Sequence, residues 1–269
     1  LSTVYDNQSN NFKTLFDFTD GSQSYKNFRD VDHFVNSYPF IPYQYELFQA
    51  AIQGISLHEG FEGKHSSVGE RSMLGVFREV AIDINQQPVG QLATFDKMFE
   101  GIRSALKTGI QGAIISSERQ LDDPFAKRLL KALFLVKYVK GFKATPRNLS
   151  ILMLERFDED IPSLRKRVEA ALNLLEQETF VQRSGDLYEY LTDEEKDIEK
   201  EIKDTEVETA DVMAELEKLV FDNVIRQRKI RYDNGQDYNY SRKMDDRLAG
   251  REHELAIHVI TPFMDGSEN

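Results

Sequence analysis

Apolar side chains recur at helical spacing from residue 38 to residue 122. Three amphipathic helices are predicted in this stretch, because apolar residues at positions i, i+3, i+4 and i+7 line one face of a helix. Ser67 and Glu70 form a capping-box pattern in front of the second helix, whose apolar face begins at Met73. No part of the stretch alternates apolar and polar residues as a half-buried strand does. The pattern predicts a helical domain over residues 38–122.

Residues 123–192 contain three more helical patterns followed by a short alternating one. The helices begin near Pro124, Thr145 and Ile161, and each has a proline in its first turn, where the fixed φ angle of proline suits a helix. The pair Ser184-Gly185 then separates two short runs of alternating residues, which is typical of a two-stranded hairpin. Three helices and a hairpin in this order predict a winged helix over residues 123–192.

The remaining segments have weaker patterns. Residues 1–37 are rich in Asn, Ser, Asp and Phe without a sustained period, and we expect a linker or the tail of a preceding domain. A capping box formed by Thr192 and Glu195 opens an acidic stretch with few apolar residues, which predicts a linker helix over residues 193–227. The apolar period then changes to two, so residues 228–269 are predicted to begin a β-containing domain. The predicted fold class is mainly α with small β.

Charge is distributed unevenly along the chain. The 34 Lys and Arg against 46 Asp and Glu give a net charge of -12, which argues against a nucleic-acid partner if the charge is evenly spread. Residues 193–217 hold 12 acids and 3 bases, whereas residues 124–147 hold seven bases and no acid. Both blocks are also explained by solvated helix faces. Local charge therefore leaves DNA open as a partner of the predicted winged helix.

Several classes of protein and site are excluded. The chain has no cysteine, so it has no disulfide, no thiolate zinc site and no cysteine nucleophile. No apolar run approaches the roughly 18 residues of a membrane span, and the N-terminus lacks the basic-then-apolar pattern of a signal peptide, so we expect a soluble intracellular protein without membrane contact. The chain opens on Leu1 and closes on polar residues, and we expect a piece of a longer protein.

Two motifs resemble ligand sites but have the wrong spacing. Gly60-Phe-Glu-Gly63-Lys64-His65 is the segment most similar to a Walker A loop, but the spacing differs and no hydroxyl residue follows the lysine directly. His253-Glu254 and His258 resemble a zinc-protease motif, but the second histidine is one position too far. We expect neither a Walker site nor a metal site in this chain.

Two groups of residues remain as functional candidates. Arg71 is expected in the first turn of a helix, from which it can project toward a neighbouring domain; the alternative is an exposed arginine paired with a nearby acid. The predicted winged helix supplies the other group, because basic and amide side chains contact phosphates and base edges. Glu169 and Glu176 on the same helix weaken this interpretation, and many winged helices pack only against protein. The candidates for contact with DNA are Lys127, Arg128, Lys131, Arg165, Lys166, Arg167, Asn173 and Arg183.

A set of short motifs taken together resembles the large P-loop ATPase of bacterial BREX phage-defence systems, the BrxC family. The resemblance extends from about Val35 to Ile225. The motifs that carry it are Tyr38-Pro-Phe-Ile-Pro-Tyr-Gln44, Gly69-Glu-Arg-Ser-Met-Leu74, Leu130-Lys-Ala-Leu-Phe-Leu-Val-Lys-Tyr-Val139, Leu164-Arg-Lys-Arg and Leu174-Leu-Glu-Gln-Glu-Thr179.

The resemblance implies an AAA+-like ATPase of the bacterial cytoplasm, in which a nucleotide-binding core precedes a helical lid and a winged helix. Residues 38–122 would then be the lid, residues 1–37 the tail of the core, and Arg71 would be placed like a sensor-2 arginine that reaches the γ-phosphate. ATP and Mg²⁺ would bind the parent protein. Since Walker A and B motifs are missing from this chain, we expect it to be inactive alone.

The resemblance leaves the partners open. Double-stranded DNA, other BREX components and further copies of the parent are all compatible with a lid followed by a winged helix. As the first alternative, the chain is a winged-helix DNA-binding module without a nucleotide role. As the second, the winged helix and the acidic helix form a scaffold for protein interaction only.

Overall fold

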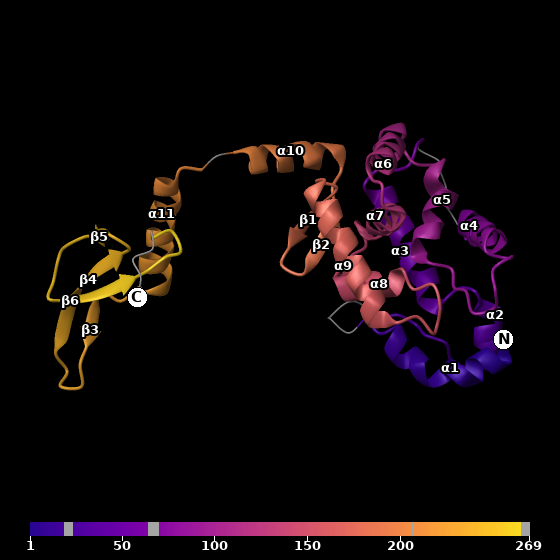
Figure 1. Ribbon diagram of the computed structural model, residues 1–269, viewed down its shortest axis with the longest axis horizontal. Coiled ribbons are helices and arrows are strands. Elements are labelled where there is room, and N and C mark those ends of the chain that lie inside the picture. The colour runs from indigo at the N-terminus through magenta and orange to yellow at the C-terminus, as the bar shows by residue number, and fades with distance from the viewer. Residues whose placement is uncertain (19–23, 64–69, 206, 265–269) are drawn as a thin grey trace. The chain divides into compact units, whose positions relative to one another are not determined.

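The chain folds into two units, residues 1–202 and residues 203–269, which are considered separately (Figure 1). The computed structural model describes residues 1–18, 24–63, 70–205 and 207–264. Helices dominate the described residues, and the strands form two small sheets. The predicted fold class of mainly α with small β is confirmed.

The first unit is built from helices, with one hairpin near its end. Its helices are α1 (Ser2–Leu15), α2 (Val31–Ser37), α3 (Pro42–Leu57), α4 (Glu70–Asp83), the short 3₁₀ helix η1 (Phe95–Lys97), α5 (Met98–Arg103), α6 (Thr108–Gln120), α7 (Pro124–Val136), α8 (Pro146–Leu152), α9 (Ile161–Gln177) and α10 (Asp193–Asp204), whose last two residues belong to the second unit. The hairpin consists of β1 (Val181–Ser184) and β2 (Leu187–Tyr190).

The described part of residues 1–37, which shows no apolar period, forms α1 and α2 and joins the core of the first unit. Phe12 on α1 is buried, and its ring centroid lies 5.6 Å from that of Phe34 on α2 and 5.1 Å from that of Phe157. Rings in such pairs are favourably placed to attract one another. A few large aromatic side chains therefore hold α1 against the rest of the first unit, although α1 lacks the regular row of apolar residues that amphipathic helices show.

Helix α3 is the most deeply buried helix of the predicted lid segment. It begins at Pro42, because the fixed φ angle of proline suits the first turn of a helix. The fully buried side chain of Gln44 accepts a hydrogen bond from the backbone N–H of Ile41 at 3.0 Å and donates one to the carbonyl of Ala93 at 2.6 Å. Both functions of a buried amide are thus satisfied, and the start of α3 is joined to the segment that precedes η1.

The helix predicted to begin near Thr94 is divided into η1 and α5, and α6 follows after a turn. Helix α5 packs closely on α4 because position 101 is a glycine. A Cβ atom on Gly101 would lie 2.7 Å from both methyl carbons of Val76, which is closer than such contacts allow. The spacing between α4 and α5 therefore depends on this residue.

Helices α7, α8 and α9 precede the β1–β2 hairpin in the predicted order. Thr145 caps α8 by accepting a hydrogen bond from the N–H of Asn148, and Asp160 caps α9 in the same way from Ser163. Strands β1 and β2 pair antiparallel, and the N–H of Tyr188 in β2 donates to the carbonyl of Ala144 at 3.0 Å. The apolar stripe of α9 is buried as predicted and comprises Leu164, Val168, Ala171, Leu172 and Leu175.

Helix α10 starts at the predicted capping box. The N–H of Thr192 donates to Glu195 Oε2 at 2.7 Å, and the N–H of Glu195 donates to Thr192 Oγ1 at 3.3 Å. The helix predicted over residues 193–227 is interrupted after Asp204. It continues as α11 (Thr209–Lys218) and the π-helical segment η2 (Leu219–Val224) in the second unit.

The second unit holds a four-stranded sheet made of β3 (Lys229–Arg231), β4 (Asp237–Met244), β5 (Arg247–Ala249) and β6 (Leu255–Val259). Strand β4 pairs antiparallel with β3 and β5 and parallel with β6. A small core of Met213, Phe221 and Met244 lies between this sheet and the helical segments of the unit. The sheet agrees with the change to a two-residue period predicted for this region.

Candidate functional site

The residues predicted to contact DNA lie on α7, on α9 and on the hairpin. Lys127, Arg128 and Lys131 belong to α7, Arg165, Lys166, Arg167 and Asn173 belong to α9, and Arg183 belongs to β1. These groups differ in their surroundings, so each is described separately.

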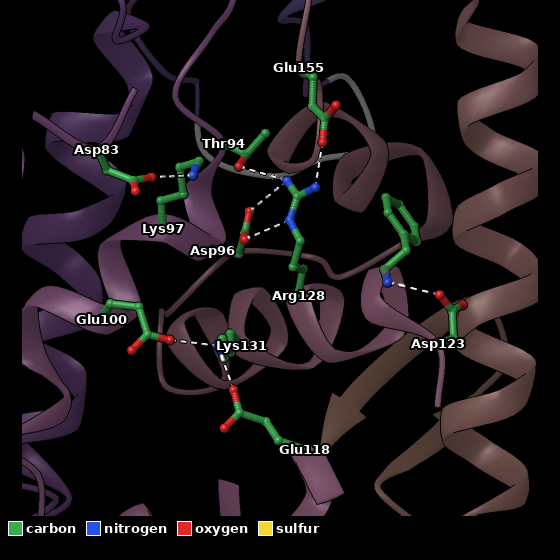
Figure 2. Close-up of polar contacts among 11 residues, drawn as sticks. Asp83, Thr94, Asp96, Lys97, Glu100, Glu118, Asp123, Arg128, Lys131 and Glu155 are labelled. Atoms are coloured by element: carbon green, nitrogen blue, oxygen red, sulfur yellow. Dashed lines mark hydrogen bonds and ion pairs between the residues drawn. The ribbon is translucent and has the colours of Figure 1, made fainter. Parts of the chain in front are cut away.

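Arg128 is surrounded by acceptors from two other parts of the chain (Figure 2). Its Nε donates to Asp96 Oδ2 at 3.0 Å, its Nη2 donates to Thr94 Oγ1 at 2.9 Å, and its Nη1 is paired with Glu155. Burial alone would lower the pKa of Arg128, but hydrogen bonds and charge from Asp96 and Glu155 raise that pKa above its ordinary value. The Asp96 side chain is only 6% exposed. Arg128 therefore stabilises a buried carboxylate and joins α7 to the segments on either side of it.

Lys131, one turn further along α7, is paired with two carboxylates. Its Nζ lies 2.6 Å from Glu100 Oε1 on α5 and 2.6 Å from Glu118 Oε1 on α6 (Figure 2). Arg103 contacts the same two carboxylates, at 3.1 and 3.0 Å. Burial would raise the pKa of Glu118, but the two bases outweigh it and lower that pKa. We refer to Asp96, Glu100, Arg103, Glu118, Arg128, Lys131 and Glu155 as the α7 charge network.

A cavity of about 360 Å³ lies beside the α7 charge network. Its ionisable lining residues are four acids and three bases: Glu79, Asp83, Asp96, Lys97, Glu100, Arg128 and Lys131. Lys97 Nζ is itself paired with Asp83 at 2.6 Å. Since the acids outnumber the bases, this cavity does not attract phosphate.

The basic residues of α9 are exposed. Arg165 pairs with Glu169 on the same helix at 3.1 Å, and the guanidinium of Arg167 lies 4.1 Å from the ring centroid of Phe125. Lys166 and Asn173 are exposed as well, and they lie two turns apart on the outer face of the helix. The α9 surface therefore keeps basic and amide groups in contact with solvent.

The hairpin adds one cation to this surface. Arg183 is exposed, donates from Nε to the carbonyl of Gly185 at 2.9 Å, and lies 5.6 Å from the ring centroid of Tyr188. Burial chiefly raises the pKa of Tyr188, Arg183 lowers it, and the nearby Glu176, Glu169 and Asp186 raise it further. The surface of α9 and the hairpin thus has mixed charge.

Lys137, just after α7, has a role that no sequence pattern indicated. Its side chain is 3% exposed, and its Nζ lies 2.7 Å from Glu195 Oε2 and 3.1 Å from Glu189 Oε1. It also donates to the carbonyl of Tyr190 at 2.7 Å. The partners come from β2 and α10, more than 50 positions away, as the separations of 52, 53 and 58 residues indicate. The capping box pointed to Glu195, but nothing in the spacing marked the lysine.

The remaining candidates do not build a ligand site among the described side chains. Arg71 lies in the first turn of α4, as expected, but its side chain lies outside the described ones, as does the Lys64-His65 pair. A Cβ on Gly60 would lie 2.6 Å from Ile55, so the backbone at Gly60 packs against protein and offers no room for a phosphate.

The described residues offer no cluster of metal ligands and no membrane-spanning helix. They contain no group of three or more His, Asp or Glu side chains placed to hold a metal ion. Nε2 of His258 lies 2.7 Å from the carbonyl of Asp245. No described helix is both long and apolar enough to cross a membrane.

Comparison with known proteins identifies the second unit. Residues 205–269 match the family model described as "BREX ATP-binding protein BrxC 4th domain with six-stranded beta sheet". The match lies on α11, η2 and the β3–β6 sheet, whereas the short motifs that carry the resemblance lie before it. No solved structure matches the chain. Over residues 205–269 the chain is thus similar to the fourth domain of BrxC, and this match supports membership of the BrxC family.

Proposed function

We propose that α7, α8, α9 and the β1–β2 hairpin form a winged helix that contacts duplex DNA within a BREX ATP-binding protein. The order of the elements supports this proposal, and so does the hydrogen bond from Tyr188 N–H to the Ala144 carbonyl. That bond pairs the segment before α8 with the hairpin, as the additional short strand of a winged helix does. Helix α9 then corresponds to the recognition helix.

The observation that carries the proposal is the difference in exposure between the two basic helices. Arg128 and Lys131 on α7 are held by carboxylates. On α9, by contrast, Lys166 and Arg167 are exposed. We therefore place the DNA surface on α9 and the hairpin, with Arg165, Lys166, Arg167, Asn173 and Arg183 as its residues, and leave Arg128 and Lys131 out of it. Lys127 on α7 is half-buried, and no carboxylate among the described residues pairs with it.

The chemistry of this surface suits a duplex. An α-helix fits the major groove, where an asparagine such as Asn173 can pair with adenine and a lysine or arginine can pair with guanine. Arg183 at the hairpin is suited to a phosphate on the flanking backbone. Glu169 and Glu176 oppose binding, so we expect weak affinity, about micromolar at low salt.

Fluorescence anisotropy with labelled duplex DNA tests the proposal. We expect Lys166→Ala with Arg183→Ala to weaken binding at least about fivefold and to reduce the slope of log K against log salt by about 2, because two phosphate contacts are lost. The matched control is Lys26→Ala with Arg78→Ala, which removes two exposed cations from elsewhere on the first unit. Equal loss in the control, or no binding by the parent chain, would contradict the proposal.

We further propose that residues 38–122 act as the lid of the nucleotide-binding part of the parent protein, with Arg71 directed at the nucleotide. This proposal rests on the resemblance and on the position of Arg71 in the first turn of α4. The experiment is Arg71→Ala in the full parent protein, where we expect ATP turnover to fall about 100-fold or more. The isolated chain is expected to show no turnover with ATP and Mg²⁺, and robust turnover by it would overturn the lid assignment.

A second candidate function is protein interaction through α10. Ile198 and Ile202 lie one turn apart on this acidic helix and are 59% and 61% exposed, which leaves an apolar pair in contact with solvent. Other BREX proteins or a further copy of the parent are the proposed partners. A complex that persists at high salt and is lost on Ile198→Ser with Ile202→Ser would favour this function over DNA contact.

A further inference from the structure

The β3–β4 hairpin of the second unit extends beyond the rest of its sheet (Figure 1). All three residues of β3 are exposed, and so are the first three residues of β4, Asp237 to Asn239. Burial begins only at Tyr240. A strand pair that is exposed on both faces contributes little to a core, so its sequence is free to serve another purpose.

The pairing register separates two kinds of side chain. Ile230 lies opposite Tyr238, and Lys229 and Arg231 lie opposite Asn239 and Asp237. Successive side chains of a strand point to opposite faces. One face of the hairpin therefore carries Lys229 and Arg231 together with Asn239 and Asp237, and the other carries Ile230 and Tyr238.

A second tyrosine extends the aromatic face toward the turn. The N–H of Tyr232 donates to the carbonyl of Gln236 at 3.0 Å, so the pairing continues by one more step beyond β3. The turn closes through Gly235, whose φ of +81° lies in the left-handed region that glycine adopts readily. Tyr232 and Tyr238 are 63% and 38% exposed. Both rings are thus available on the same face.

Positive charge is concentrated on the same hairpin, with Lys229 and Arg231 on the face opposite the rings. The segment from Arg226 to Arg231 holds four bases and no acid, in a chain whose net charge is -12. Arg228, Lys229 and Arg231 form no ion pair with any acid in the described parts of the chain. These cations keep their attraction for an anionic partner, in contrast to those of the α7 charge network.

The base of the hairpin is held in place by hydrogen bonds within the second unit. The hydroxyl of Tyr240 and the guanidinium of Arg242 both donate to the carbonyl of Gln227. Arg226 donates from Nε to the carbonyl of Asn223 at 3.0 Å. These contacts fix the base of the hairpin, while its outer part stays free for a ligand.

We propose that the β3–β4 hairpin is a second nucleic-acid-binding element and that it takes a single strand. Its cations match the phosphates of a backbone, and exposed tyrosine rings stack on unpaired bases. A duplex hides the faces of its bases, so the two tyrosines favour single-stranded over double-stranded nucleic acid. The proposal does not depend on the winged helix, because the hairpin belongs to the other unit.

Binding of labelled oligothymidine to the complete chain tests the cations. We expect Arg228→Gln with Lys229→Gln and Arg231→Gln to reduce the slope of log K against log salt by about 2, since each lost phosphate contact on a single strand accounts for about 0.7. The matched control is Lys218→Gln with Arg247→Gln and Arg251→Gln, which removes the same charge from exposed positions outside the hairpin. An equal loss in the control would mean that net charge alone sets the affinity and would overturn the proposal.

A second set of variants tests the rings. We expect Tyr232→Ala with Tyr238→Ala to weaken binding of oligothymidine at least about fivefold with an unchanged salt slope, because stacking is not electrostatic. Tyr232→Phe with Tyr238→Phe should bind like the parent chain, and Phe263→Ala removes an exposed ring elsewhere as control. Circular dichroism and the melting temperature check that all variants fold.

The duplex proposal for α9 and the single-strand proposal for the β3–β4 hairpin can be contradicted independently of each other. Lys166→Ala with Arg183→Ala should weaken duplex binding and leave binding of oligothymidine unchanged. If that variant abolishes single-strand binding, or if the hairpin variants leave it intact, the hairpin is not the binding element. A preference of the parent chain for duplex over oligothymidine that persists in the tyrosine variants would also overturn the proposal.

Discussion

Helices α7 and α9 carry similar basic residues in very different surroundings. On α7, Arg128 and Lys131 meet carboxylates supplied by four other segments of the first unit. On α9, the ion pair of Arg165 is made with Glu169 of the same helix, and Lys166 is exposed. The same residue types therefore join elements in one helix and form a solvent-exposed surface in the other.

The difference follows from where the acids lie in the sequence. Asp96 and Glu155 are 32 and 27 positions from Arg128, so a local charge count over residues 124–147 finds seven bases and no partner. The fold brings the partners together. A basic stretch in a sequence is thus a weak indication of a nucleic-acid surface until the positions of distant acids are known.

The largest expected effect is on Arg128. Arg128→Met removes the partner of the buried Asp96 carboxylate, and we expect the free energy of unfolding to fall by about 3 kcal/mol. Urea denaturation measures this loss. Arg165→Met on α9 serves as the control, with an expected change within about 0.5 kcal/mol because its ion pair is exposed. Similar losses in the two variants would remove the distinction between the helices.

Lys137→Met is expected to have the next largest effect. It leaves Glu195 and the Tyr190 carbonyl without their buried donor, at a cost of about 2 kcal/mol. Amide hydrogen exchange in the first turn of α10 should also become faster, because this lysine ties that turn to α7. Lys140→Met removes an exposed lysine from the same basic stretch, and it should change neither quantity.

The α7 charge network should make stability depend on pH. Burial opposes the charged form of Glu100 and Glu118, but Lys131 and Arg103 lower the pKa of both acids below 4.5 overall. Their contribution is therefore present above pH 4.5 and is lost as the pH falls through the lowered values. The parent chain should therefore lose free energy of unfolding between about pH 7 and about pH 3. In Lys131→Met we expect this loss to be smaller by about 1 kcal/mol, and the difference is small because Glu100 is half exposed. Lys140→Met removes the same charge and serves as the reference. If the unfolding free energy of Lys131→Met depends on pH in the same way as that of Lys140→Met, the α7 charge network does not cause the pH dependence.

The smallest expected effect is an increase in the affinity of the α9 surface for duplex DNA. Glu169→Gln removes an acid from the proposed DNA surface and releases Arg165 from its ion pair. We expect duplex affinity to rise about threefold, because the charge facing the phosphates becomes more positive. The measurement is fluorescence anisotropy at low salt, with Glu46→Gln on α3 as a control far along the chain. Weaker binding by Glu169→Gln would place the DNA surface elsewhere.

Local signals in the sequence were sufficient for much of the fold. Thr145, Asp160 and the pair Thr192 and Glu195 cap their helices through contacts within three residues, which can be recognised without tertiary information. The buried stripe of α9 follows from spacing alone. The same is true of the turn at Gly185, whose φ of +62° suits glycine.

Features that depend on distant contacts were not predictable. Helix α1 is fixed by aromatic packing of Phe12 with Phe34 and Phe157, and no periodic stripe announces it. The break between α5 and α6 and the pairing of Lys137 with Glu195 likewise require the fold. For the candidate site, the sequence identified the basic residues of α9, but it could not separate them from those of α7. It also gave no weight to the β3–β4 hairpin, because equal numbers of acids and bases over residues 218–269 concealed the local excess.

The close packing of α4 on α5 at Gly101 has a further consequence. Helix α4 carries Arg71, so side-chain bulk at position 101 would act as a wedge that moves this arginine without altering any charge. Ala at position 101 already brings its Cβ within 2.7 Å of the Val76 methyl carbons, so we expect even this substitution to move α4 away from α5. The spacing of α4 and α5, and with it the position of the backbone at Arg71, thus depends on the absence of a side chain at position 101.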